Sequence, residues 1–119
     1  MKINKKLELS IIEWNANTFE DCTLASQIDK LQEEIEEVKN SESMSEFYKE
    51  LSDCYIVACA LKRWSLFAYE LAIFRIQALE NEYNWEIPQE SFEKMIADKL
   101  EINKKRKWIK NKEGVYHHE

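Results

Sequence analysis

The stretch "KLQEEIEEVKN" (residues 30–40) decides the expected fold, because its apolar residues recur at helical spacing. At about 100° per residue, one helix face collects the apolar side chains Ile28, Leu31, Ile35 and Val38. Thr23 stands where an N-cap belongs, so the pattern predicts a helix over Leu24–Lys39. This helix would turn its apolar stripe toward a core and its glutamates away from or beside that core.

The rest of the chain also favours helices, because it contains a single glycine, Gly114, and a single proline, Pro88. A first helix is expected around residues 7–14, followed by a loop through residues 15–22. Ser43 and Glu46 have capping-box spacing, so another helix should begin near Met44. The apolar residues of 64–79 would form a further helix or a kinked extension of that one.

Pro88 fits the first turn of a last helix ending near residues 108–110, after an interruption at "NEYNWEIP" (residues 81–88). The end of the chain, residues 111–119, resembles a loop. At 119 residues the chain is long enough for one core and too short for two. We therefore predict an all-α fold: a single domain over residues 1–119, built as an antiparallel four- to five-helix bundle.

The cysteines and the hydropathy pattern indicate a cytoplasmic protein. Cys22, Cys54 and Cys59 have no metal-binding spacing and are odd in number, which argues against a secreted disulfide framework. The N-terminus lacks the apolar segment of a signal peptide. The most hydrophobic run, residues 54–61, is far shorter than the roughly 20 residues that span a bilayer. No membrane association is expected.

The glutamates of residues 33–37 divide by direction. Glu33 and Glu36 fall on faces expected to meet water, whereas Glu34 and Glu37 align with Lys30 in a stripe beside the apolar one. An ordinary solvated acidic helix face is the alternative, because glutamate is a good helix former. A functional site therefore requires a second group of residues that faces this pair.

Glu50 and Asp53 provide that second group, since they lead into an apolar stripe on one helical face. A buried carboxylate is unfavourable unless it is paired or bound to a metal. Asp53 could instead be satisfied by a salt bridge to Lys30 or Arg106. Four converging carboxylates would favour Mg²⁺, Mn²⁺ or Ca²⁺, and the absence of Glu-x-x-His motifs disfavours a di-iron site.

The last helix adds positive charge. Its inward face begins with apolar residues and continues with Lys99, Asn103 and Arg106, which could hold a polyphosphate beside an acidic metal site. The neighbouring residues Lys104, Lys105 and Lys107 have the character of solvated charges. Nucleic acid is not an expected partner, because the net charge is -6 and no docking motif is present.

These motifs resemble the all-α nucleoside triphosphate pyrophosphohydrolase superfamily, the MazG-like proteins, in their compact phage and bacterial form. The family's EExxE and ExxD elements are matched by Glu33, Glu34, Glu37, Glu50 and Asp53. Its K-x-x-x-N-x-x-R element is matched by Lys99, Asn103 and Arg106. The segment "QIDKL" (residues 27–31) is also similar to the residues that precede EExxE in such proteins.

The resemblance implies Mg²⁺-dependent hydrolysis of a nucleoside triphosphate, NTP or dNTP, to the monophosphate and pyrophosphate, with Mn²⁺ as a substitute metal. The implied metal ligands are Glu34, Glu37, Glu50 and Asp53. The implied substrate contacts are Lys30, Lys99, Asn103 and Arg106. Glu33 would orient or deprotonate the attacking water, and the chain would assemble as a homodimer or homotetramer that serves nucleotide-pool housekeeping.

Two alternatives stay open. The same fold could act as a non-catalytic regulatory module that binds nucleotide or metal. Trp14 or Phe19 could stack on the base, although aromatic residues on a short amphipathic helix more often serve packing.

Overall fold

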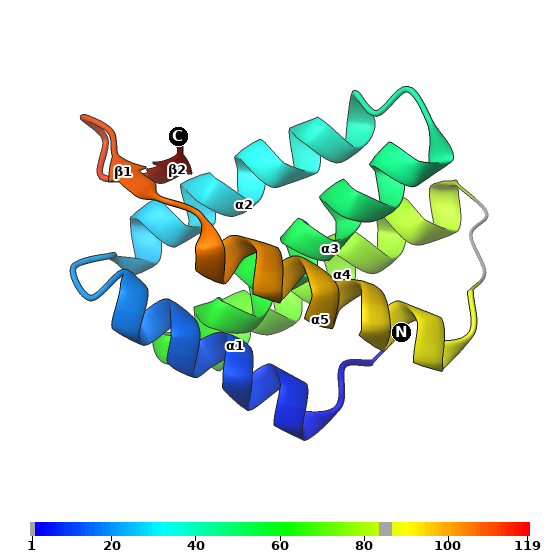
Figure 1. The fold of residues 1–119 in the computed structure, drawn as a ribbon, viewed down its shortest axis with the longest axis horizontal. Coiled ribbons are helices and arrows are strands. Elements are labelled where there is room, and N and C mark those ends of the chain that lie inside the picture. Colours follow the sequence, from blue (N-terminus) through cyan, green and yellow to red (C-terminus); the bar gives the residue numbers. More distant parts are fainter. Residues whose placement is uncertain (1, 84–86) are drawn as a thin grey trace.

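A computed structural model describes residues 2–83 and 87–119. Within these residues the chain forms α1 (Lys5–Thr18), α2 (Leu24–Lys39), α3 (Met44–Ala60), the 3-10 turn η1 (Leu61–Arg63), α4 (Leu66–Glu82), α5 (Gln89–Lys105), β1 (Trp108–Lys110) and β2 (Tyr116–His118). Successive helices run in opposite directions, so that α2 and α4 oppose α1, α3 and α5 (Figure 1). The predicted all-α class and bundle architecture are confirmed, with a small terminal sheet in addition.

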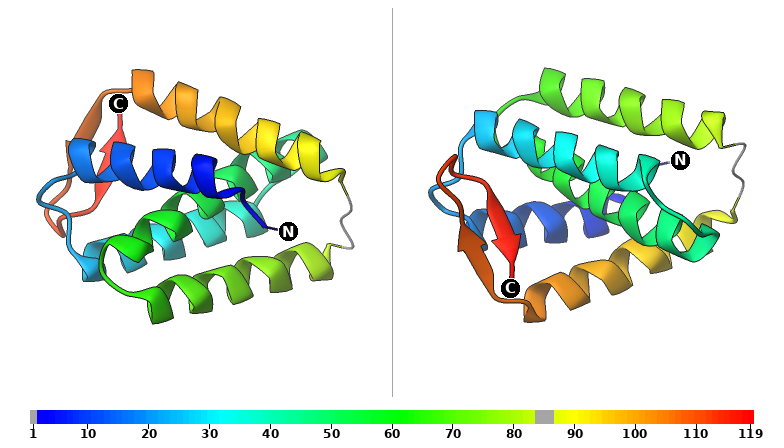
Figure 2. Two further views of the ribbon diagram at one scale, coloured as in Figure 1. Left: turned by 90° about the horizontal axis from the view of Figure 1, so that it is seen from below. Right: turned by 90° about the horizontal axis from the view of Figure 1, so that it is seen from above.

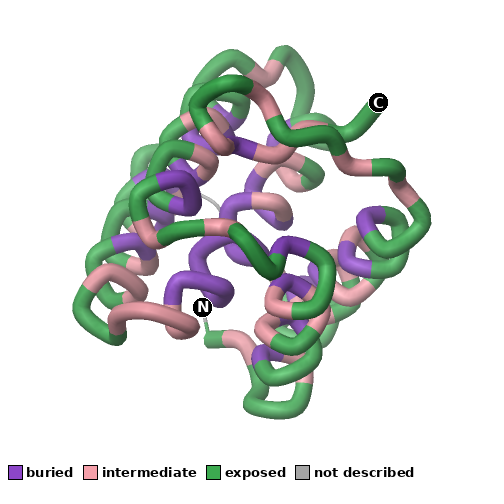
Figure 3. The backbone as a smooth tube through the Cα atoms, turned by 90° about the vertical axis from the view of Figure 1, so that its left-hand side faces the viewer, coloured by how far each residue is buried: buried purple, intermediate pink, exposed green. Residues whose placement is uncertain are grey.

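Helix α3 is the centre of the bundle and packs against α1, α2, α4 and α5. Its residues from Cys54 to Ala60 are all buried, because they meet neighbouring helices on every side. The other helices lie around α3 (Figure 2), and their buried residues gather on the sides that face the interior of the bundle (Figure 3). Cys54 and Cys59 are fully enclosed core residues.

The helix starts follow from local capping. The Thr23 side chain accepts the backbone N–H of Ser26, and the Ser43 side chain accepts that of Glu46 at 3.1 Å. These bonds satisfy amide groups that have no partner within the first helical turn. The predicted bounds of α2 and the predicted start of α3 are therefore confirmed. A 3-10 turn and the Ser65 cap make α4 a separate helix.

Three predicted boundaries are wrong. Helix α1 continues to Thr18 because Asn15, expected in a loop, is buried in the bundle. Pro88 is the N-cap of α5 rather than a residue of its first turn. At the other end, α5 stops at Lys105, where the backbone of Arg106 becomes extended. The predicted interruption at residues 81–88 falls partly on residues outside those described.

The predicted terminal loop is also wrong, since residues 108–118 form a β-hairpin. Strand β1 pairs antiparallel with β2, with Trp108 opposite His118 and Lys110 opposite Tyr116. Gly114 allows the turn, because its φ of 82° lies in the left-handed region that favours glycine. The Trp108 indole donates to the carbonyl of Asn103 at 3.0 Å, which fixes the hairpin against the end of α5. The strands lie beside the N-terminal half of α2 (Figure 1).

No helix among the described residues combines the length and apolar character required to cross a membrane.

Candidate metal and phosphate site

The two acidic pairs predicted from the sequence meet between α2 and α3. Oxygen atoms of Glu34, Glu50 and Asp53 lie within 4.8 Å of one another, and Glu37 lines the same cleft. The short α2–α3 connection folds the two helices back against each other, and this packing places the pairs face to face. The cleft has a volume of about 210 Å³.

Glu34 is the most deeply placed of these acids. Its side chain is 8% exposed, and Lys30 Nζ lies 3.3 Å from Oε1. Within residues 2–83 and 87–119, Glu34 Oε2 is buried without a hydrogen-bond partner. A buried carboxylate oxygen in this state is unfavourable unless a cation or a proton joins it.

Burial and the neighbouring acids oppose ionisation of the cluster. Burial, followed by the charge of Asp53, raises the pKa of Glu34 to about 8. Burial and a hydrogen bond with Glu37 raise the pKa of Glu50 to about 7. Burial also opposes ionisation of Glu37, but its neighbours Glu50 and Glu34 stabilise the charged form and lower its pKa. The protonated forms of Glu34 and Glu50 are therefore favoured, and a divalent cation that bound here would displace those protons.

Asp53 is held by residues of α5. Lys99 Nζ lies 3.3 Å from Oδ2, and the Asn103 amide donates to Oδ1 at 3.2 Å. Burial raises the pKa of Asp53, although Lys99 and Asn103 act in the opposite direction. The salt-bridge partner is thus Lys99, and neither Lys30 nor Arg106, the two partners considered from the sequence, forms this bridge. Arg106 donates to Asn103 Oδ1 at 3.3 Å and lines the cleft.

Four predicted substrate contacts consequently surround the acidic cluster. Lys99 and Arg106 line the cleft from α5, Asn103 is buried behind them, and Lys30 lines it from α2. Lys30 Nζ also lies 6.0 Å from the centre of the Trp108 ring. Carboxylates and cations therefore line one cleft together, an arrangement suited to a metal-bound polyphosphate.

Glu33 lies apart from this cleft. Its side chain is 42% exposed, and His117 Nε2 lies 2.9 Å from its Oε2. Lys30 Nζ is 3.9 Å away. The structure therefore places Glu33 on the rim formed by α2 and the hairpin, and not among the grouped carboxylates.

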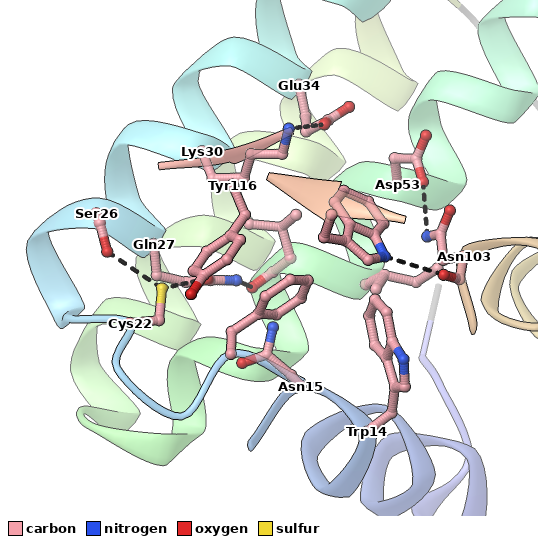
Figure 4. Close-up of a pocket in the computed structure, with 14 residues that line it drawn as sticks. Trp14, Asn15, Cys22, Ser26, Gln27, Lys30, Glu34, Asp53, Asn103 and Tyr116 are labelled. Carbon is pink, nitrogen blue, oxygen red and sulfur yellow. Dashed lines mark hydrogen bonds and ion pairs between the residues drawn. The ribbon is translucent and has the colours of Figure 1, made fainter. Parts of the chain in front are cut away.

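An aromatic pocket adjoins the cleft and shares Lys30, Glu34, Asp53 and Trp108 with it (Figure 4). Trp14 and Phe19 both line this pocket, and both rings also pack edge-to-face against Trp108, at 6.1 and 5.3 Å between centroids. Either role considered for these two residues, stacking or packing, is compatible with this position.

Polar side chains form one wall of the same pocket. The Gln27 amide donates to the Val57 carbonyl at 3.1 Å, and Arg63 donates to Asn15 Oδ1 at 2.6 Å. The Cys22 thiol and the Ser26 hydroxyl lie 3.1 Å apart. A few hydrogen-bonding groups among aromatic rings are the usual composition of a small-molecule pocket.

The hairpin contributes site residues that the sequence interpretation missed. Trp108, His117 and His118 line the acidic cleft, and Tyr116 lines the aromatic pocket, 4.6 Å from Phe19 between ring centroids. The hairpin could have been recognised from two short segments rich in β-branched and aromatic residues, which flank the turn "NKEG" (residues 111–114).

Comparison of the chain with protein-family models, with curated proteins and with solved structures found no match. An assignment of function therefore depends on the motif spacing and on the site geometry.

Proposed function

We propose that the protein is a MazG-like nucleoside triphosphate pyrophosphohydrolase, which releases pyrophosphate and a nucleoside monophosphate in a cytoplasmic nucleotide-pool role. The observation that carries this proposal is the buried Glu34 oxygen, which has no hydrogen-bond partner among the described residues. It lies in a cleft lined by four carboxylates and by Lys99 and Arg106. A structural ion-pair network would have no reason to leave that oxygen unsatisfied.

The donor set fits Mg²⁺, with Mn²⁺ as a substitute, because the grouped ligands are hard carboxylate oxygens. Glu34, Glu37, Glu50 and Asp53 would hold the metal. When bound, Mg²⁺ neutralises phosphate charge and makes water more acidic. The unsatisfied Glu34 oxygen supports this fit, since a cation would supply the partner that the protein does not.

The remaining residues would bind and orient the substrate. Lys99 and Arg106 would attract the phosphate oxygens, and Asn103 would keep both Asp53 and Arg106 in place through its two hydrogen bonds. Glu33 would act from the rim by orienting or deprotonating a water molecule. The aromatic pocket would receive the base beside the phosphates.

The proposal is tested by incubating the protein with a panel of NTPs and dNTPs, with either Mg²⁺ or EDTA, and measuring pyrophosphate and monophosphate. The expected result is a metal-dependent, equimolar release of both products. Absence of metal-dependent product from every nucleotide, canonical or modified, would contradict the enzyme assignment.

A non-catalytic module that binds nucleotide or metal is the second candidate, supported by the same cleft and by the exposed position of Glu33. Calorimetric binding measured beside turnover separates the two. Tight, Mg²⁺-dependent nucleotide binding without hydrolysis would favour the module.

A further inference from the structure

Helix α4 is apolar on two opposite faces. One face is buried against α3 through Ala72, Ile76 and Leu79. The other presents Phe67 and Phe74, which are 71% and 72% exposed. The exposed charged residues Glu70 and Arg75 lie between these two apolar faces. An exposed apolar patch of this kind marks an interaction surface more often than a solvated face. In Figure 2, α4 lies at an edge of the bundle, so its outer face has no helix of this chain against it among the described residues.

The exposed residues form a continuous stripe. Phe67, Leu71, Phe74 and Ala78 follow one another at spacings of four, three and four residues, which is the seam of a helix pair. No charged residue interrupts the stripe, in agreement with the depletion of charge at interface centres. Leu66, which is 60% exposed, extends the patch at its start.

Helix α2 borders the same surface. Arg75 donates to Gln32 of α2 at 2.6 Å, and Ile28, one turn before Gln32, is 41% exposed. The two largely exposed phenylalanines and the neighbouring aliphatic residues provide on the order of 500 Å² of apolar surface per chain. A standard interface buries about 800 Å² on each partner, and the polar rim around the stripe would supply the difference.

We propose that this α4 stripe is the contact surface between two copies of the chain, packed antiparallel about a two-fold axis. The stripe complements itself in this arrangement. With the axis between Leu71 and Phe74, Leu71 faces Phe74 of the second copy and Phe67 faces its Ala78. Each phenylalanine thus meets a smaller residue, which allows the side chains to interdigitate.

The first experiment measures mass by analytical ultracentrifugation over a range of protein concentrations. The wild-type chain is expected at twice its 14.3 kDa mass. Phe74→Glu and Phe67→Glu should each weaken association by roughly 100-fold or more, because a carboxylate would be buried against an apolar surface. Leu9→Glu on α1 is the matched control, since Leu9 is also half-exposed at 52% and lies outside the stripe. Circular dichroism establishes that each variant is folded.

Cross-linking then tests the antiparallel register. Helical residues advance about 1.5 Å each, so the two copies of Leu71 would lie about 4.5 Å apart along the axis and the two copies of Phe67 about 16 Å. In a Cys22→Ser background, Leu71→Cys should form an intermolecular disulfide on oxidation and Phe67→Cys should not, because disulfides join Cα atoms less than about 7 Å apart.

A wild-type chain that stays monomeric at every concentration would overturn the proposal, and the patch would then belong to a different partner or to none. A dimer that survives the Phe67→Glu, Phe74→Glu double substitution would place the interface elsewhere. Equal cross-linking through both cysteine positions would exclude the antiparallel register.

Discussion

Replacing Glu34 by glutamine should make the metal-free protein more stable at alkaline pH while removing its response to Mg²⁺. Glu34 is buried, and its Oε2 has no hydrogen-bond partner in the part of the chain that the structure describes. Glutamine has nearly the same shape and does not ionise, so it removes the buried charge without leaving a cavity. The same substitution removes a ligand from the proposed metal site.

The sign follows from proton linkage. The pKa of Glu34 is raised from 4.5 to about 8 in the folded chain. Between these values the folded state binds more protons than the unfolded state, so the stability of the wild type falls as pH rises through this window. Below this pH window Glu34 is protonated in both the folded and the unfolded state, so the loss of stability is absent. Above about pH 8 the loss is complete. The shift from 4.5 to about 8 at about 1.4 kcal/mol for each pKa unit gives a penalty on the order of 5 kcal/mol.

Thermal unfolding followed by circular dichroism, in EDTA and in excess Mg²⁺, measures both effects. Near pH 9 in EDTA, Glu34→Gln should unfold roughly 15–20 °C above the wild type, and the difference should shrink near pH 5. Excess Mg²⁺ should raise the unfolding temperature of the wild type, because the ion binds only the folded state. It should have little effect on the variant.

Glu36→Gln is the matched control, because Glu36 is exposed on the same helix and pairs with Lys39 at 3.7 Å. It should change neither the pH dependence nor the Mg²⁺ response. The reasoning is refuted if wild-type stability rises with pH between about 5 and 8. It is also refuted if Mg²⁺ stabilises Glu34→Gln as much as the wild type.

Three further substitutions address the rest of the site. Glu37→Gln and Asp53→Asn should each lower pyrophosphate release at least ~100-fold, about 2.7 kcal/mol, with an unchanged helical spectrum; retained turnover would exclude either residue as a ligand. Arg106→Ala should raise KM for the triphosphate by roughly 10-fold, and unchanged steady-state kinetics would remove Arg106 from substrate binding. Trp108→Ala should weaken nucleotide binding in calorimetry by about 1–3 kcal/mol, whereas Ile109→Ala, exposed in the same strand, should not.

The features predicted correctly from the sequence depend on local signals. Thr23 and Ser43 each accept a backbone N–H three residues on, so the starts of α2 and α3 could be predicted from a few neighbouring residues. The convergence of Glu34 with Asp53 was also accessible, because consecutive helices joined by a short loop pack against each other. Directional sorting of the glutamates then identified Glu34 as the acid that borders the interior, whereas Glu37, which was grouped with it, lines the cleft but is exposed.

The features that the sequence interpretation missed depend on contacts between distant residues. The last helix was predicted to end near residues 108–110, but the Trp108 indole donates to the Asn103 carbonyl and the backbone is already extended at Arg106. Strands of three residues are too short to show a clear alternation, and only their packing on α2 and Phe19 makes them recognisable. The histidines at the cleft were missed for the same reason.

Glu33 remains the decisive residue for separating catalysis from binding. Glu33 immediately precedes Glu34, so its side chain is rotated by about 100° around the helix axis and lies outside the cleft that Glu34 lines. From the rim, beside His117 at 2.9 Å, it could act only on a water molecule. Glu33→Gln should therefore lower kcat by roughly 100-fold, leave KM nearly unchanged and preserve the Mg²⁺-dependent rise in unfolding temperature that Glu34→Gln loses. An unchanged kcat would show that the chemistry proceeds without Glu33, and a lost Mg²⁺ response would make Glu33 part of the metal site instead.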